Sequence, residues 1–170
     1  KNLELLTKNH VYSKEMEHDA CGVGLIASTE GKKSRAIVEY GIEALKAVWH
    51  RGAVDADGKT GDGAGIHVEI PKDFFIEKIQ VTGHDYDNSE ICVGMIFLPK
   101  NDYSAQESCK TIVESELTKN NFSIYGWRQV PVNPKVLGEK ALQTMPEIIQ
   151  VLFKSNDPNL LDKNLERKIY

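Results

Sequence analysis

The sequence lacks the features that mark membrane, secreted and nucleic-acid-binding proteins. Its 170 residues contain no apolar run that approaches the roughly 18 residues of a membrane-spanning helix. Residues 1–20 lack the apolar core of a secretory signal peptide. Acidic residues (25) outnumber basic ones (21), the net charge is −4, and no basic cluster is present, so an electrostatic nucleic-acid surface is excluded. We expect neither a membrane nor a nucleic acid as a partner.

Cysteine is equally scarce. The three cysteines are an odd number without a framework spacing, which is typical of a reducing compartment, so a cytoplasmic location is predicted. There is no CxxC motif and no paired His/Cys spacing, so no metal site is predicted. Cys92 and Cys109 fall at apolar positions of expected elements, and we predict that both are packing thiols.

The residues that are present suit one domain with a core of its own. Hydrophobic residues make up 41% and charged residues 27% of the chain, an ordinary balance for a globular protein. Alternating or fully apolar stretches predict strands at 22–27, 66–70, 91–98, 122–130 and 146–153. Helical spacing predicts helices at 34–49, at 71–79, from 104 to about 117 and from 157 onward. The mixture indicates an α/β or α+β fold.

Four details of these elements are predicted as well. Ser34 suits an N-cap, and residues 104–107 have the form of a capping box. The stretch 91–98 is apolar on both faces, which predicts a covered, central strand. Strict alternation would place Tyr125 and Trp127 on one face of their strand.

A cysteine stands at the start of the first apolar stretch. If the bond between Ala20 and Cys21 were cut, the thiol would belong to an N-terminal residue with its own free amine. Such an amine has a pKa of roughly 7.7–8.0, so it can act as the base that activates its own side-chain nucleophile. The alternative is an inert, buried thiol before a strand.

An arginine and a glycine-rich stretch follow the first expected helix. Arg51 either complements the helix dipole near the C-terminal end or binds a carboxylate or carbonyl group of a bound amino acid. The stretch 55–65 has four glycines but no Gly-Lys-Ser/Thr ending, so it is not a phosphate-binding loop. We predict a tight loop that leads into a strand.

Three short motifs together resemble the glutamate synthase family. They are residues 17–24 (EHDACGVG), 50–53 (HRGA) and 60–66 (TGDGAGI), in the order and at the spacing of that family. The resemblance implies an α+β fold, the N-terminal nucleophile (Ntn) hydrolase four-layer αββα sandwich, incomplete at its C-terminal end. It also implies that residues 1–20 are a propeptide and that residues 21–170 are the N-terminal part of a class II glutamine amidotransferase domain.

The resemblance further implies a function. Cys21 would be the catalytic nucleophile and Arg51 a substrate-binding residue, in a site that hydrolyses glutamine to glutamate and ammonia. In the family the ammonia is channelled to 2-oxoglutarate in another domain of the same chain, to form glutamate. That step uses FMN, an iron–sulfur cluster and either NADPH, oxidised by a small partner subunit, or ferredoxin. None of these cofactors is expected to bind within these 170 residues.

The family's oxyanion pair and the residues that grip glutamine have no match before Tyr170. We therefore expect this chain by itself to be an inactive fragment of a longer protein. Two other functions stay open from the residues. One is the glutaminase domain of another class II amidotransferase; the other is a non-catalytic, ligand-sensing domain of the same fold.

Overall fold

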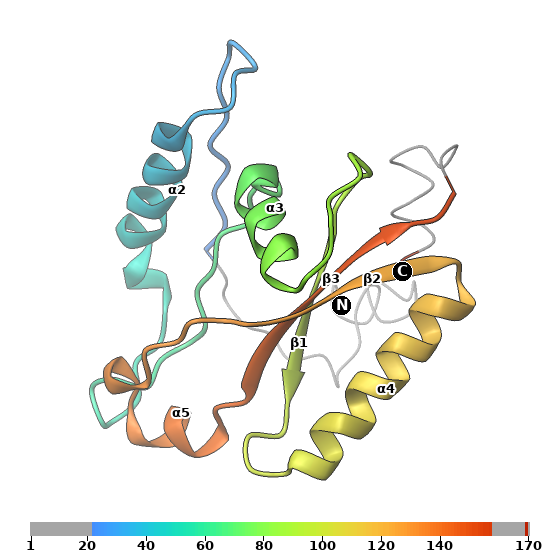
Figure 1. The fold of residues 1–170 in the computed structure, drawn as a ribbon. Coiled ribbons are helices and arrows are strands. Elements are labelled where there is room, and N and C mark those ends of the chain that lie inside the picture. The colour runs from blue at the N-terminus through green and yellow to red at the C-terminus, as the bar shows by residue number, and fades with distance from the viewer. Residues whose placement is uncertain (1–21, 158–168, 170) are drawn as a thin grey trace, which may run out of the picture. The chain divides into compact units, whose positions relative to one another are not determined.

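The computed structural model describes residues 22–157 and residue 169. The chain divides into two compact units, Lys1–His67 and Val68–Tyr170. Figure 1 shows their helices and strands. The predicted propeptide and the helix predicted from residue 157 lie outside the described residues, except that Asp157 and Ile169 are described. Within the described ranges, no helix combines the length and the apolar character that a bilayer crossing requires.

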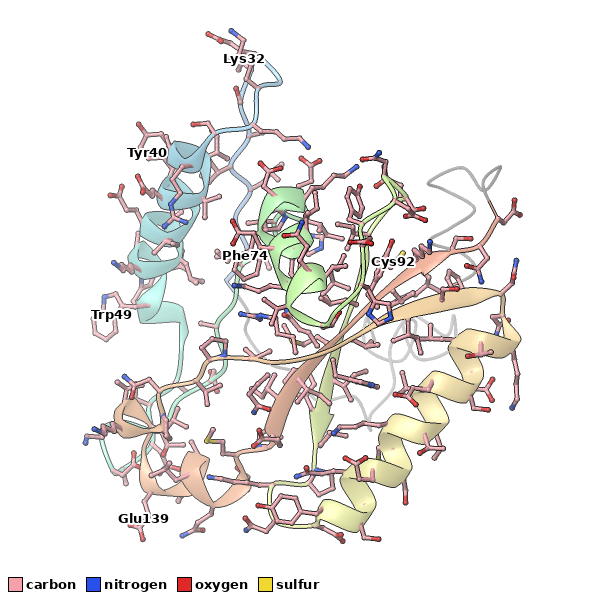
Figure 2. The ribbon with its side chains drawn as sticks, viewed as in Figure 1. Lys32, Tyr40, Trp49, Phe74, Cys92 and Glu139 are labelled. Atoms are coloured by element: carbon pink, nitrogen blue, oxygen red, sulfur yellow. The ribbon has the colours of Figure 1, made fainter. Side chains whose placement is uncertain are left out.

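The described residues of the first unit, 22–67, form a well-capped helix but no buried core. Helix α2 (Arg35–Ala47) begins after Ser34, whose Oγ accepts from the Ala36 amide at 3.2 Å, so the predicted N-cap is confirmed. Figure 2 shows Tyr40 and Trp49 projecting outward from this helical segment, and they are 57% and 75% exposed. The apolar stripe of the helix is only half-buried, and no residue described in this unit is buried.

Two predicted strands of this region are not observed. Residues 22–28 have no regular secondary structure, and Val23 and Leu25 are 92% and 89% exposed. Residues 66–70 are also irregular, with Ile66 and Val68 about half exposed. A strand is defined by the partner that pairs with its backbone, and neither stretch has one among residues 22–157. The apolar pattern alone was therefore not sufficient to predict a strand at 22–27 or at 66–70.

The second unit is built on a three-stranded antiparallel sheet. Its strands are β1 (Cys92–Leu98), β2 (Phe122–Gln129) and β3 (Glu147–Ser155), in the spatial order β1-β3-β2. Because β1 and β2 both run antiparallel to β3, they are parallel to one another. Helix α4 (Tyr103–Lys119) makes the connection between them that parallel strands require. The central strand is thus β3, and the prediction of β1 as a central strand is wrong.

Each face of this sheet carries one helix (Figure 1). Helix α3 (Lys72–Val81) packs on one face, where Phe75 and Ile79 form a cluster with Ile91, Tyr125 and Leu152. Helix α4 packs on the other face, over a cluster of Cys92, Phe122, Val151 and Phe153. The second unit therefore has three layers, helix, sheet and helix. On the α3 face, Met95 and Phe97 of the edge strand β1 remain 49% and 63% exposed.

A bulge in β2 changes which side chains share a face. The pairing with β3 shifts between Ile124 and Gly126, and an extra residue reverses the alternation beyond it. Tyr125 consequently packs with α3 and Trp127 with α4, so the prediction that they share a face is wrong. The hydroxyl of Thr82, at the end of α3, donates to the carbonyl oxygen of Tyr125 at 2.7 Å and ties the helix to the bulge.

The start of α4 also differs from the sequence prediction. Asp102, rather than Ser104, is the N-cap, and its Oδ1 accepts from the Ala105 amide at 2.9 Å. The predicted capping box of Ser104 and Glu107 is therefore not formed, because Ser104 lies inside the helix. The buried amide of Gln106 donates to the carbonyl oxygens of Pro99 and Lys100. Between β2 and β3 lie the turn η2 (Pro134–Val136) and the short helix α5 (Glu139–Thr144).

Candidate active site

The predicted nucleophile, Cys21, lies outside the described residues. The description begins at Gly22, and the chain that follows is irregular up to a turn in which the Gly31 amide donates to the Ser28 carbonyl oxygen at 3.2 Å. The role of Cys21 therefore stays a prediction from the sequence. The backbone of the two other motifs, residues 50–53 and 60–66, is described.

Arg51 is the last residue of a short turn of helix. Helix α2 ends at Ala47, and η1 (Trp49–Arg51) follows it directly. Gly52 closes this turn, because its amide donates to the Trp49 carbonyl oxygen at 3.0 Å and its backbone is extended. The main chain of Arg51 is thus held at the point where helical structure ends; its side chain is not described.

His50 has a structural partner. Its Nδ1 lies 3.2 Å from the carbonyl oxygen of Ala47, one of the acceptors that a helix leaves open at its C-terminal end. This contact ties the imidazole back to the end of α2. This contact gives His50 a structural role at the end of α2.

The residues after Arg51 form a small hairpin that ends in the third motif. Val54 and Gly61 pair as an antiparallel bridge. The Asp55 amide donates to the Thr60 carbonyl oxygen at 2.7 Å, and the Asp62 amide donates to the Ala53 carbonyl oxygen at 3.2 Å. The HRGA and TGDGAGI motifs are therefore joined by a main-chain hydrogen bond between Asp62 and Ala53.

Aspartate side chains complete this hairpin at both ends. At the open end, Asp62 Oδ2 accepts from the Ala53 amide at 2.9 Å. At the turn, Asp57 Oδ1 accepts from the amides of Lys59 and Thr60 at 2.9 and 2.7 Å, and Asp57 Oδ2 accepts from the Thr60 hydroxyl. Gly58 has φ +67°, a conformation that favours glycine. The turn is thus defined by aspartate and glycine chemistry.

The structure unites two of the three motifs and adds residues that the sequence reading missed. The sequence reading assigned no role to Asp57 or Asp62. A signal was present, because aspartates beside glycines commonly accept hydrogen bonds from nearby backbone amides. The pattern cannot indicate which amide is bonded, since Asp62 reaches nine residues back along the chain to Ala53.

The described residues offer no metal site. Within 22–157, no group of three or more histidine, cysteine, aspartate or glutamate side chains is arranged to hold an ion. Cys92 is buried in the core of the second unit and Cys109 is half-buried on α4, as expected of packing thiols. Burial, followed by the charge of Glu90, raises the pKa of Cys92 to about 11. It is therefore poorly suited to act as a nucleophile.

An open hollow of about 700 Å³ belongs to the second unit alone. Its lining includes His84, Asn121, Tyr125 and Lys154. The Lys154 ammonium group pairs with Asp87, which also accepts from the Tyr125 hydroxyl at 3.0 Å. All the lining residues belong to the second unit, and none of the described residues of the three motifs is among them.

Comparison with known proteins identifies the family. A model of the family "Glutamine amidotransferases class-II" matches residues 21–170. The large chain of NADPH-dependent glutamate synthase from Azospirillum brasilense is 53% identical over 169 residues, which are 99% of this chain and 11% of that protein. A ferredoxin-dependent glutamate synthase from Pyropia yezoensis is 40% identical over 98% of this chain and 10% of its own length. The NADH-dependent glutamate synthase of Saccharomyces cerevisiae is 35% identical over 96% of this chain and 8% of its own length.

The chain thus spans about a tenth of the length of these relatives. The family match covers most of the chain, including the hairpin that joins two of its motifs. The chain belongs to the class II glutamine amidotransferases.

Proposed function

We propose that this chain is the glutaminase part of a glutamate synthase, with Cys21 as the N-terminal nucleophile and Arg51 as a residue that binds glutamine. The observation that carries the proposal is the family match from residue 21 to residue 170, together with relatives that are all named glutamate synthases. That match begins at Cys21, whereas the similarity to the Azospirillum protein extends over 169 residues and so includes most of residues 1–20. This difference is what a leader outside the catalytic domain would produce.

The proposed reaction begins after the bond between Ala20 and Cys21 is cut. The α-amino group of Cys21 takes the proton from its own thiol, and the thiolate attacks the side-chain amide carbon of glutamine. The amine then gives this proton to the departing nitrogen, which leaves as ammonia, and a γ-glutamyl thioester remains. Water hydrolyses the thioester, which releases glutamate and restores the thiol. With residues 1–20 attached, the nitrogen is an amide without basicity, and the chain is a zymogen.

Arg51 would hold the substrate in this reaction. A guanidinium group is planar, permanently charged and suited to a carboxylate, and free glutamine carries one on its α-carbon. Gly52 and the Asp62 hairpin fix the main chain on the C-terminal side of Arg51. The backbone that follows Arg51 is therefore restrained, as a substrate-binding role for this residue would require.

The complete enzyme would use the ammonia elsewhere. We propose transfer to a separate domain where it reacts with 2-oxoglutarate; FMN and an iron–sulfur cluster would supply the reducing chemistry there. The described residues do not fit an iron–sulfur cluster, because Cys92 and Cys109 are packed within the second unit and no metal-binding group is present in residues 22–157. The relatives use NADPH, ferredoxin or NADH. A cytoplasmic location and a small electron-donating subunit, as in an NADPH-dependent enzyme, belong to the same proposal.

The fold proposal follows the function. We propose that the complete domain is the Ntn hydrolase αββα sandwich, of which residues 21–170 are the N-terminal part. Sheet β1-β3-β2 carries a helix on each face. The described residues thus supply the mixture of helix and sheet that such a domain requires, and the pairing of two facing sheets belongs to the proposal.

The decisive experiment is the N-terminal sequence and intact mass of the protein expressed from its complete gene, combined with a glutaminase assay. We expect a mature chain that begins at Cys21 and hydrolyses glutamine, and a Cys21→Ala variant that keeps its leader and is inactive. A chain that retains residues 17–20 and is fully active would overturn the α-amine mechanism. A Cys21→Ala variant as active as the wild type would overturn the role of Cys21 as the nucleophile, and a mature wild type without glutaminase activity would favour a ligand-sensing domain.

A further inference from the structure

We propose that Asp62 is a positioning residue for the glutamine-binding arginine, acting through the backbone amide of Ala53. This inference rests on the proposed function, because it assigns a support to the glutaminase site. It is carried by the hydrogen-bond pattern of the hairpin at residues 53–62, in which one expected main-chain acceptor is replaced by the side chain of Asp62.

The replacement is visible in the register of the hairpin. Val54 opposes Gly61, so Ala53 opposes Asp62. In a regular antiparallel ladder, two residues in such a hydrogen-bonded pair exchange both amide-to-carbonyl bonds. Here the Asp62 amide donates to the Ala53 carbonyl oxygen at 3.2 Å, but the Ala53 amide donates to the Asp62 carboxylate at 2.9 Å. Asp62 therefore binds Ala53 through its backbone and its side chain together.

This double contact lies two residues from Arg51. The chain between them is short and already restrained, because the Gly52 amide is bonded to the Trp49 carbonyl oxygen. The two amides that follow Arg51 are thus both fixed, one by the end of η1 and one by Asp62. The direction in which the backbone leaves Arg51 determines where its side chain can reach, so Asp62 sets that direction without touching substrate.

The negative charge of Asp62 strengthens its hydrogen bond with the Ala53 amide. A hydrogen bond from an amide to a carboxylate is stronger than one to a neutral carbonyl. No residue described in this unit is buried, so packing offers little alternative support for the segment. We therefore expect the segment after Arg51 to depend on this side chain more than it would in a well-packed core.

The test uses the protein expressed from its complete gene. Removing a positioning group for ground-state binding raises KM and leaves kcat nearly unchanged. We expect Asp62→Ala to raise the KM for glutamine on the order of tenfold, with kcat within about threefold of the wild type. Asp62→Asn keeps an oxygen acceptor for the Ala53 amide and should restore KM to within about threefold of the wild-type value.

A pair of labelling reagents separates positioning from general damage. Diazo-oxo-norleucine has the α-carboxylate of glutamine, whereas iodoacetamide has none; both alkylate a reactive cysteine. In Asp62→Ala, labelling of Cys21 by the glutamine analogue should slow about tenfold while labelling by iodoacetamide is unchanged. The matched control is Asp57→Ala, which loses acceptors at the turn of the same hairpin and leaves the Ala53 amide bonded. It should keep the wild-type KM.

Each other outcome overturns the inference in an identifiable way. An unchanged KM and unchanged labelling in Asp62→Ala would show that the contact does not position the site. Equal slowing with both reagents, or the same effect in Asp57→Ala, would show that the hairpin has only a structural role. If the wild type neither hydrolyses glutamine nor labels at Cys21, the proposed function fails and the inference fails with it. If Asp62→Ala does not fold, Asp62→Glu, which moves the carboxylate by one methylene, replaces it in the same comparison.

Discussion

Gly61 lies so close to Ala53 that a Cβ atom on Gly61 would be 2.9 Å from the Ala53 carbonyl oxygen. Real Cβ atoms almost never approach a backbone atom so closely, and a main-chain oxygen within a hydrogen-bonded hairpin cannot simply move aside. The TGDGAGI motif thus needs a glycine at this position for close approach of two chain segments. The glycine is explained by this steric requirement alone, without a bound phosphate or nucleotide.

The first prediction concerns this glycine. Gly61→Ala should separate the two sides of the hairpin and weaken the bonds from the Asp55 and Asp62 amides. We expect faster hydrogen exchange across residues 53–62, measured by mass spectrometry. The matched control is Gly63→Ala, because a Cβ on Gly63 meets no atom within 4 Å. Equal exchange rates in the two variants would contradict the steric explanation.

The second prediction concerns the bulge in β2. Gly126 has φ +146°, which side-chain-bearing residues rarely adopt, and a Cβ there would lie 2.8 Å from Thr82 Cγ2. We expect Gly126→Ala to lower the free energy of unfolding by more than about 1 kcal/mol, measured in urea by the fluorescence of Trp127 and Trp49. Adding Thr82→Ser removes the clashing methyl group but not the backbone strain, so it should recover only part of the loss. Full stability of Gly126→Ala would refute this account.

The third prediction concerns the reactivity of Cys92. Burial, with a smaller contribution from the charge of Glu90, raises the pKa of its thiol to about 11 from an ordinary value of 9.0. At a pH near 8 the thiolate fraction is then lower by about a hundredfold than in the unfolded chain. We expect iodoacetamide to label Cys92 at least that much more slowly in the folded protein than in urea. Rapid labelling of Cys92 under native conditions would contradict its placement in the core.

The sequence predicts the local elements of the second unit well. Strands at 91–98, 122–130 and 146–153 and helices from 71 and 104 are all observed within a few residues of the predicted bounds. The periodic spacing of apolar residues in these elements reflects packing against a neighbouring element, and this unit has buried clusters on both faces of its sheet. The same reasoning placed Ser34 correctly at the start of α2, since an N-cap depends only on nearby backbone amides.

The errors concern properties that a local pattern does not contain. The apolar stretch of β1 suggested a central strand, yet β3 lies at the centre, because strand order depends on partners far along the chain. The bulge before Gly126 adds one residue and separates Tyr125 from Trp127. At α4, two residues with capping ability stand close together, and Asp102 rather than Ser104 takes the position.

At the candidate site, too, the local features were predicted and the longer-range contact was not. The motifs indicated Arg51 and the glycine-rich loop, because each residue type has a characteristic chemistry. The pairing of Ala53 with Asp62 spans nine residues, and it could not be derived from either motif alone. The role proposed for Asp62 therefore depends on the register of the hairpin, which neither motif contains.

The last prediction concerns the acid stability of the second unit. Asp87 accepts hydrogen bonds from the Lys154 ammonium group and, at 3.0 Å, from the Tyr125 hydroxyl. The bond from Lys154 is the largest cause that holds the pKa of the Asp87 carboxyl well below its usual range, and desolvation opposes it. The folded protein therefore keeps this carboxylate ionised at a pH where the unfolded chain, with a pKa of about 3.9, has already bound a proton. Linkage then requires that the stability contributed by Asp87 is present above about pH 4 and is lost as the pH falls further.

Urea unfolding between about pH 3 and pH 7 tests this consequence. The free energy of unfolding should fall toward acid in the wild type, and Asp87→Asn should be less stable near pH 7 but lose less stability on acidification. Asp85→Asn is the matched control, since it removes a carboxylate only two residues away but leaves the bonds to Lys154 and Tyr125 in place. Its acid profile should follow that of the wild type. If Asp87→Asn and the wild type lose stability in parallel as the pH falls, the ionised Asp87 does not stabilise the fold, and the acid sensitivity of this unit must come from other carboxylates.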